Sequence, residues 1–307
     1  MVRPRLIPLL LLKNGLLVRS QGFETHQFIG NPMSTIERFS HWNADEIVIL
    51  DIGGSKNHDL RRDDLQQQYS GQSILDVLSE IAKVCFMPMA VGGQIRSLQD
   101  IEDRLRHGAD KCVINTQALL DQELVSAAAD TFGSQSVVVS IDAKRHADGR
   151  YEVFSHNGKV ATGISPGEWA ARCEEAGCGE LFLNSIDRDG GGVGFDIELI
   201  RQVTGSVKIP VVACGGAGHY KDFSSAILDG EASAAAAANL FHFFELSYPL
   251  AKKATIEAGV PLRPNRIGSR WIKREPVYNT IRENRRIEDR IAQSRGTKFS
   301  NNQDGEL

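Results

Sequence analysis

Residues 89–116 read MAVGGQIRSLQDIEDRLRHGADKCVINT, and they decide the fold of this 307-residue chain. They give a short apolar strand, a turn at Gly92 and Gly93, an amphipathic helix, and a second strand that leads to Asn115 and Thr116. Glycine lets backbone N–H groups approach an anion without interference from a Cβ atom. Small polar groups after the next strand can also reach a phosphate. The pattern predicts a phosphate-binding turn, although a tight turn without a ligand would carry the same glycines.

A second stretch repeats this order. Residues 211–239 read VVACGGAGHYKDFSSAILDGEASAAAAAN, with a strand, Gly215 and Gly216, a helix that ends before Gly230, and a small-residue strand that ends at Asn239. Repetition of this kind indicates internal duplication. Two similar anion sites also favour a ligand with two anionic ends. We therefore predict a barrel made of two similar halves.

The rest of the chain alternates between continuous apolar runs and helical patterns. The predicted strands are 6–12, 46–52, 87–91, 111–115, 136–141, 180–185, 209–214 and 232–239. The predicted helices are 33–42, 73–84, 98–107, 122–132, 166–176, 196–203, 220–228 and 244–258. Apolar strands that are each followed by a helix are typical of parallel α/β architecture. Residues 1–262 are therefore predicted to form a (β/α)₈ barrel. A doubly wound open sheet is the alternative, but no G-x-G-x-x-G opens any of these helices.

Composition limits the class of protein. The chain is 41% hydrophobic and 24% charged with a net charge of −4, which fits a globular protein and argues against nucleic-acid binding. The five cysteines show no paired metal spacing, so we expect a reduced, cytoplasmic protein without a metal or cofactor. The apolar run 9–12 is too short for a signal peptide or a membrane span. We interpret it as a buried first strand and expect no membrane insertion.

Two further segments carry polar groups that could do chemistry. Asp142 ends the apolar run of the fifth strand, where partial desolvation could raise the pKa of its carboxyl group into a useful range. The alternative is a structural Asp that caps a turn or pairs with Lys144. Residues 184–192, NSIDRDGGG, are dense in carboxylates and glycine. They lack a full EF-hand pattern and a His, which favours a mobile or ligand-binding turn over a metal site.

The C-terminal extension, residues 263–307, differs from the barrel. It is rich in Arg and Lys, with a plausible helix between positions 276 and 295 and a tail at 300–307 that we expect to be disordered. Such an extension could dock a partner, contact an acidic surface, or form a solvated helix.

The motifs DEIVILDI, GADKCVINT, VVVSIDAKR, SIDRDG and ACGGAG together resemble the cyclase subunit of imidazole glycerol phosphate synthase, the HisF family. The resemblance covers residues 3–266. It implies a (β/α)₈ barrel of two halves that binds a substrate with two phosphates, one in each half.

The resemblance also implies roles for individual residues. It assigns a first phosphate grip to Gly93, Asn115 and Thr116, next to Gly92. It assigns a second phosphate grip to Gly190, Gly216, Ala238 and Asn239, next to Asp189 and Gly215. Asn239 stands where the family usually has Ser. Ammonia from a partner glutaminase would enter through a ring of charged residues that matches Arg5, Glu46, Lys111 and Glu180, with Asp110 at the glutaminase interface. Alternating charges at this position could also close the barrel by ion pairing alone.

The sequence departs from the family pattern at one of the catalytic residues. The family uses two catalytic Asp residues, and the second matches Asp142. The first falls at Leu11, which can neither transfer a proton nor hold a charge. Loss of one member of an acid–base pair should cost roughly 10²–10⁴-fold in rate. Asn14 replaces another acidic residue, and Arg19 replaces a usual Lys.

Three hypotheses follow. The first is a synthase subunit that receives ammonia from a HisH-like glutaminase and delivers it, with a sugar amidotransferase, for amidation of a nucleotide-linked sugar in surface-polysaccharide (lipopolysaccharide) biosynthesis. The chain resembles a divergent branch of the family in keeping the ammonia-entry residues while its catalytic pair is altered, and this is the function that the resemblance to that branch implies. The second is a histidine-pathway cyclase in which Asp51 or Asp187 replaces the lost Asp. The third is a non-catalytic conduit or scaffold with vestigial grips.

Overall fold

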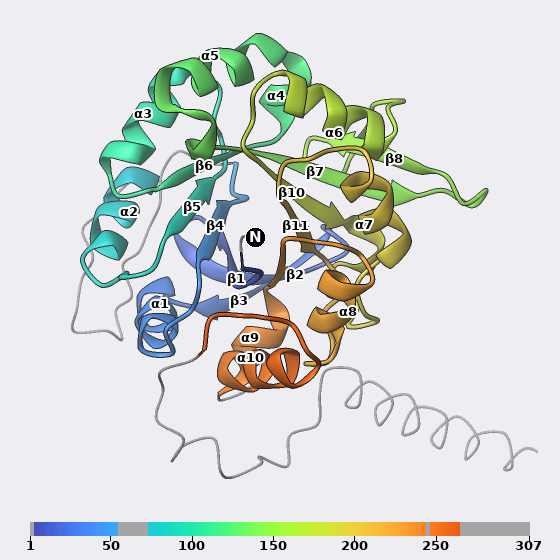
Figure 1. Cartoon of the computed structure of the whole chain (residues 1–307). Helices are drawn as coiled ribbons and strands as arrows, with labels where there is room; N and C mark the ends of the chain where they lie inside the picture. Colours follow the sequence, from blue (N-terminus) through green and yellow to red (C-terminus); the bar gives the residue numbers. More distant parts are fainter. Residues whose placement is uncertain (1–2, 55–72, 244–245, 265–307) are drawn as a thin grey trace, which may run out of the picture.

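The computed structural model of the chain describes residues 3–54, 73–243 and 246–264 (Figure 1). Parallel strands form a closed barrel, because β1 pairs with β12 and β7 pairs with β10. The barrel strands are β1 (Arg5–Lys13), β4 (Ile47–Asp51), β5 (Met89–Gly92), β6 (Lys111–Ile114), β7 (Val137–Arg145), β10 (Glu180–Ser185), β11 (Val211–Cys214) and β12 (Ala234–Ala237). The prediction of a (β/α)₈ barrel is confirmed, and the closure excludes an open doubly wound sheet.

Helices surround the barrel on the outside (Figure 1). They are α1 (Pro32–His41), α2 (Ile74–Ala82), α3 (Leu98–Arg106), α4 (Thr116–Leu120), α5 (Gln122–Phe132), α6 (Pro166–Glu175), α7 (Ile197–Thr204), α8 (Asp222–Leu228), α9 (Asn239–Phe243) and α10 (Ser247–Glu257). Several begin at a side-chain cap. The hydroxyls of Ser73, Ser97 and Ser165 each accept a hydrogen bond from a backbone N–H in the first turn, which satisfies a donor that the helix itself cannot pair.

Two hairpins extend the barrel and were not predicted. β2 (Leu16–Gln21) and β3 (Thr25–Gly30) follow β1, whereas β8 (Tyr151–Ser155) and β9 (Val160–Ala161) follow β7. β1 and β7 are each nine residues long, and each continues into an antiparallel strand. The first strand of each half is thus built alike, which supports the duplication inferred from the two Gly-Gly stretches.

Asn-Gly and Asp-Gly dipeptides mark both hairpin turns. Asn14 and Gly15 have φ values of 53° and 82°, the left-handed region that a two-residue hairpin turn requires. Gly149 follows Asp148 with a φ of 89°. The sequence therefore contained a signal for both hairpins, because these dipeptides stand between runs that can pair as strands.

Alternation along the strands sorts side chains between two layers. One layer packs between the strands and the helices. The other, here called the interior cluster, fills the barrel. Its members are Ile7, Leu9, Leu11, Val18, Val48, Ala90, Val113, Val138, Phe182, Val212, Cys214, Ala234 and Ala236.

Some predicted boundaries differ from the structure. Gly92 is the last residue of β5 rather than part of the turn. Asp142 lies inside β7, which is longer than predicted because it continues as one arm of the β7–β8 hairpin. Most of the predicted C-terminal extension lies outside the described residues. Among the described residues, no helix is both long and apolar enough to cross a bilayer.

Candidate active site

Four charged side chains close one end of the barrel. Arg5 pairs with Glu46 and Glu180, and Lys111 pairs with the same two carboxylates at Nζ–Oε distances of 2.8 and 2.7 Å. The charges alternate in sign, and every carboxylate oxygen is used once. The predicted members therefore do lie together, and we call them the charged ring.

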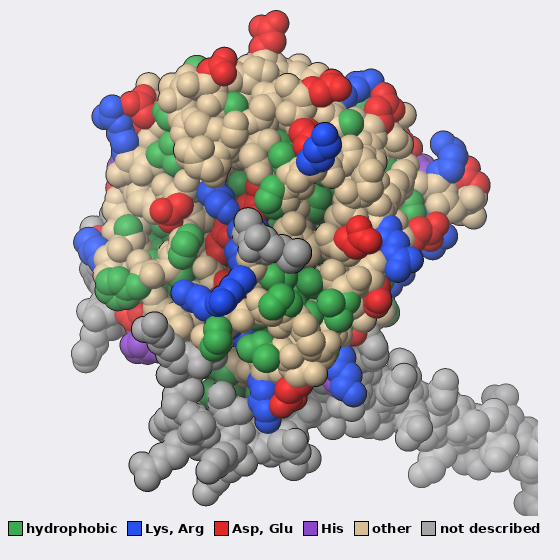
Figure 2. Space-filling model, in the orientation of Figure 1, with side chains coloured by type: hydrophobic (Ala, Val, Ile, Leu, Met, Phe, Trp, Pro, Cys, Tyr) green, Lys and Arg blue, Asp and Glu red, His purple; other side chains and the backbone are tan. Residues whose placement is uncertain are grey.

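The charged ring lies at the end of the barrel where the strands begin. In the view down the barrel, Lys or Arg and Asp or Glu side chains gather around the barrel axis (Figure 2). Asp110 lies at the same end, directly before β6, and is exposed. Its carboxylate accepts a hydrogen bond of 2.8 Å from the backbone N–H of Met89, so part of its role is to join β5 and β6.

The interior cluster separates the charged ring from the opposite mouth of the barrel. Leu11 belongs to this cluster and is 7% exposed. In β1 it faces the interior from the side opposite β7, the strand of Asp142. At the level of Leu11, therefore, β1 presents an apolar side chain to the interior, whereas β7 carries the acid.

Asp142 is a buried carboxyl that is hydrogen-bonded to the side chain of Asn115. It is 4% exposed, and its Oδ2 accepts a hydrogen bond of 2.7 Å from the Asn115 amide. Burial raises the pKa of Asp142 to about 7, and the Asn115 bond opposes that rise. A carboxyl with a pKa near neutrality can exchange a proton in either direction. The alternative pairing with Lys144 does not occur, because Lys144 is exposed and lies 6.0 Å from the Phe154 ring centre.

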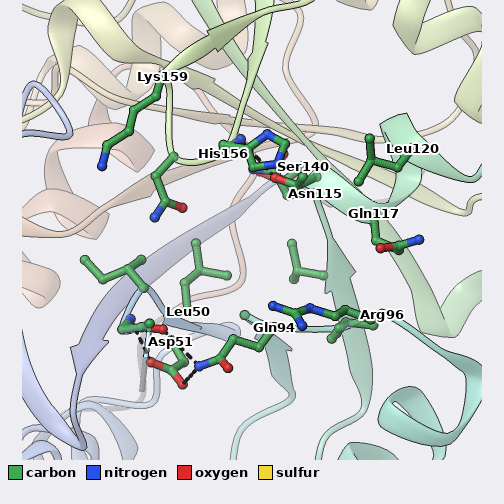
Figure 3. Close-up of a pocket in the computed structure, with 18 residues that line it drawn as sticks. Leu50, Asp51, Gln94, Arg96, Asn115, Gln117, Leu120, Ser140, His156 and Lys159 are labelled. Atoms are coloured by element: carbon green, nitrogen blue, oxygen red, sulfur yellow. Dashed lines mark hydrogen bonds between the residues drawn. The ribbon is translucent and has the colours of Figure 1, made fainter. Parts of the chain in front are cut away.

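The first phosphate grip opens into a cavity of about 550 Å³, the first pocket (Figure 3). Gly93, Asn115 and Thr116 all line it. Gly92 does not line it. A Cβ on Gly92 would lie 2.7 Å from a methyl carbon of Leu50, so this glycine serves packing rather than the pocket.

Gly93 shows why the turn needs glycine. Its φ is +108°, and a Cβ there would lie 2.2 Å from the carbonyl oxygen of Asp51. Arg104 holds the turn from behind, because its guanidinium donates to the Gly93 carbonyl at 2.6 Å. The sequence analysis missed Arg104, which occupies an apparently ordinary position on the amphipathic helix.

The β8–β9 hairpin supplies one wall of the first pocket. The backbone N–H of His156 donates to the Thr116 hydroxyl at 3.0 Å. The hairpin also brings Asn157 and Lys159 to the cavity, and Arg96 reaches it from the turn after β5. Asn157 and Lys159 were missed because the hairpin itself was not predicted.

The residues predicted for the second phosphate grip lie together but leave little open space. Asp189, Gly190, Gly215, Gly216, Ala238 and Asn239 line one cavity of about 20 Å³. Gly216 repeats the geometry of Gly93, with a φ of +103° and a Cβ position 2.2 Å from a carbonyl oxygen.

The β2–β3 hairpin lies against this second grip. The amide of Asn239 donates to the Ser20 carbonyl at 2.8 Å, and Asp189 accepts from the Ser20 hydroxyl at 2.6 Å and from the Phe23 N–H at 3.1 Å. Burial raises the pKa of Asp189, and these two bonds oppose the rise. Two side chains of the second grip therefore fasten the hairpin.

Asp51 and Asp187, the two acids considered as replacements for the lost Asp, have hydrogen-bond partners other than Asp142. Leu50 packs against the interior cluster, so Asp51 faces away from the interior and instead lines the first pocket. Asp187 is exposed, and its carboxylate accepts a 2.6 Å bond from the Arg145 N–H. Among the described residues, no group of three or more His, Cys, Asp or Glu could hold a metal ion.

Comparison with known proteins agrees with this architecture. The family model of the histidine biosynthesis proteins matches residues 5–247. Imidazole glycerol phosphate synthase subunit HisF from Caulobacter vibrioides is 42% identical over 265 residues, which span 86% of this chain and 97% of that protein. The HisF subunit from Alkaliphilus metalliredigens is 38% identical over 263 residues, spanning 86% of this chain and 100% of that protein. The HisF subunit from Hyphomonas neptunium is 42% identical over 263 residues, spanning 86% and 99%. The chain therefore belongs to the HisF family of imidazole glycerol phosphate synthase subunits.

Proposed function

We propose that this chain is a HisF-type synthase subunit that receives ammonia from a HisH-like glutaminase and passes it through the barrel to Asp142. The observation that carries this proposal is the alignment of three layers along the barrel. The charged ring lies at one end, the apolar interior cluster follows, and Asp142 lies in the same barrel at the other end. An apolar passage suits neutral ammonia better than ammonium, because burial of an unpaired charge is unfavourable.

The phosphorylated substrate would bind at the mouth. Gly93, Asn115 and Thr116 offer backbone and side-chain donors in the first pocket, and the second grip offers Gly190, Gly216 and Asn239. Because Asn115 lines the first pocket and also touches Asp142, the reacting part of the substrate would lie beside Asp142.

Leu11 favours a destination for the ammonia other than the cyclase reaction. With Leu11 at the position of the first Asp, Asp142 lacks the partner acid that the family chemistry uses. We therefore propose that ammonia is delivered, with a sugar amidotransferase, for amidation of a nucleotide-linked sugar in polysaccharide biosynthesis. The histidine-pathway cyclase is the second candidate, because relatives named for that synthase reach 42% identity. The five free cysteines support a reducing, cytoplasmic setting for either reaction.

The test is a cyclase assay with the bisphosphate aminoimidazole-carboxamide substrate of the histidine pathway and excess ammonium. The native chain and a Leu11→Asp variant would be compared by following substrate loss spectroscopically. We expect no robust turnover by the native chain and measurable turnover by Leu11→Asp. Robust native turnover would overturn sugar amidation and establish the histidine-pathway reading. Binding of the substrate without turnover by either protein would support the third possibility, a non-catalytic conduit.

A further inference from the structure

Two members of the charged ring are sequence neighbours of a second polar cluster, which lies outside the barrel. Arg5 is followed by Leu6, and Glu46 is preceded by Asp45. Because side chains alternate along β1, Arg5 faces the interior, whereas Leu6 packs in the layer between the strands and the helices. The Asp45 carboxylate lies in this outer layer too, since it contacts α10. The charged ring and the second cluster therefore share two short pieces of backbone.

The Asp45 carboxylate is the centre of the second cluster. Its Oδ1 accepts from Lys252 Nζ at 2.7 Å and from Arg263 Nε at 3.2 Å, and its Oδ2 accepts from the Leu6 N–H at 3.2 Å. Lys252 is completely buried. Burial lowers the pKa of Lys252, and the bond to Asp45 opposes that change. Because a buried charge without its partner is strongly unfavourable, the position of Asp45 is tightly fixed.

Tyr248 on α10 joins the two backbone pieces directly. Its hydroxyl accepts from the Asp45 N–H at 2.9 Å and donates to the Leu6 carbonyl at 3.1 Å. Tyr248 is completely buried, so its ring has little freedom to move. One rigid side chain thus sets the distance between β1 and the loop before β4. Arg5 and Glu46, one position further along each piece, form an ion pair whose spacing follows from that distance.

Arg263 fastens the same loop from the start of the C-terminal extension. Besides its bond to Asp45, its Nη2 donates to the carbonyls of Asn43 and Ala44 at 3.1 Å each. The Arg263 side chain is 48% exposed, so these bonds rather than burial determine where it lies. The Arg-rich remainder of the chain continues from this point. The loop before β4 is therefore held both by α10 and by the first residue of the extension.

We propose that Asp45 is a positioning residue for the charged ring, and that Arg263 couples the start of the C-terminal extension to the ring through Asp45. A shift of the loop before β4 moves Glu46, and Glu46 pairs with both Arg5 and Lys111. The proposal rests on the proposed function for its purpose, because it assigns control of the ammonia entrance to residues outside the ring.

The experiment measures hydrogen exchange of the Arg5 guanidinium N–H groups by nitrogen-15 NMR on the full chain, together with the Tm of each protein. The variants are Asp45→Asn, Tyr248→Phe and Arg263→Gln. We expect exchange at Arg5 to rise roughly tenfold in Asp45→Asn and about threefold in each of the other two, because the guanidinium exchanges when its ion pairs open. A cluster that only stabilises the fold would lower the Tm without this local change.

Asp196→Asn is the matched control. Asp196 is also buried, accepts from a tyrosine hydroxyl (Tyr151, at 2.9 Å) and pairs with an arginine (Arg188, at 3.3 Å), but it lies at the start of α7. The control should lower the Tm and leave exchange at Arg5 unchanged. An equal rise at Arg5 in the control would indicate general loosening and would overturn the positioning role.

Two further outcomes decide the proposal. Unchanged exchange at Arg5 in both Asp45→Asn and Tyr248→Phe would overturn the positioning role, and Tyr248→Phe decides alone if Asp45→Asn does not fold, because it keeps the ion pairs of Asp45. Unchanged exchange in Arg263→Gln would overturn the coupling to the extension. The measurement uses no glutaminase, ammonia or substrate, so it can fail while the proposed function holds, and the cyclase assay can fail while the positioning role holds.

Discussion

The Asn115 amide donates a hydrogen bond of 2.7 Å to the Asp142 carboxylate, across the gap between strands β6 and β7. Asn115 also lines the first pocket. A ligand in that pocket is therefore one side chain away from the buried acid, and a change at Asn115 reaches Asp142 directly.

Asn115→Leu should raise the pKa of Asp142 above its value of about 7, because the lost bond favours the ionised carboxylate. Carbon-detected NMR of the Asp142 carboxyl would measure the titration. Gln117→Leu is the control, since Gln117 lines the same pocket and no hydrogen bond joins it to Asp142. A pKa that stays in place in Asn115→Leu would contradict the assignment of this bond.

Asp142→Asn should stabilise the fold at alkaline pH. Burial raises the pKa of Asp142 from 3.8 to about 7, so between these values the folded chain binds more protons than the unfolded chain. The free energy of unfolding of the native chain therefore falls as pH rises through this window, by about 4 kcal/mol from this group. Urea titrations at pH 4.5 and pH 8 would compare the proteins. The advantage of the variant should grow across the window, and a constant difference would show that Asp142 is not buried as an acid.

Lys111→Met should affect glutamine-dependent activity more than activity with added ammonium. The substitution removes both ion pairs of Lys111 from the charged ring. We expect a loss of about tenfold or more with the glutaminase and a much smaller loss with ammonium. Lys83→Met, which removes an exposed ion pair with Glu80, is the control. Equal losses in the two assays would remove the argument for a channel.

Ser20→Ala should loosen the β2–β3 hairpin. It removes the 2.6 Å bond to Asp189, while the Phe23 N–H bond to the same carboxylate remains. Amide exchange in residues 16–30 should rise about tenfold, with little change in Tm, since a local opening is affected rather than the core. Ser79→Ala, on α2, is the control. Unaltered exchange in the hairpin would mean that other contacts hold it.

Gly93→Ala should destabilise the chain by about 2–4 kcal/mol, because alanine would need a left-handed φ and would collide with the backbone of Asp51. Gly54→Ala is a close control, since no atom lies within 4 Å of the added Cβ. Chemical denaturation would measure both variants. A Gly93→Ala chain as stable as the control would show that the turn can rearrange.

The sequence was informative wherever a local pattern has one physical meaning. Apolar runs followed by helical patterns predicted the barrel, and Gly93 and Gly216 indeed occupy left-handed positions that only glycine fits without strain. The charged ring residues, which the family resemblance selected, lie in contact although Arg5 and Glu180 are far apart in the chain.

Contacts between elements that are distant in the chain could not be predicted from the sequence. The pocket wall formed by His156 and Lys159 depends on the β8–β9 hairpin. Because the hairpin was not predicted, neither residue was predicted to line the pocket. Nothing in the local sequence shows that Asn115 would bond to Asp142, because that contact depends on the register of β6 against β7. The close fit of the β2–β3 hairpin on the second grip likewise depends on tertiary packing.

The charged ring also has a consequence for how the end of the barrel can open. Glu46 and Glu180 each accept from Arg5 with one carboxylate oxygen and from Lys111 with the other, so each of the four oxygens has a partner within the ring. Rotation of Lys111 away from the axis breaks both of its ion pairs together and leaves both carboxylates short of a partner. Opening this end of the barrel at Lys111 would therefore cost two ion pairs at once rather than one.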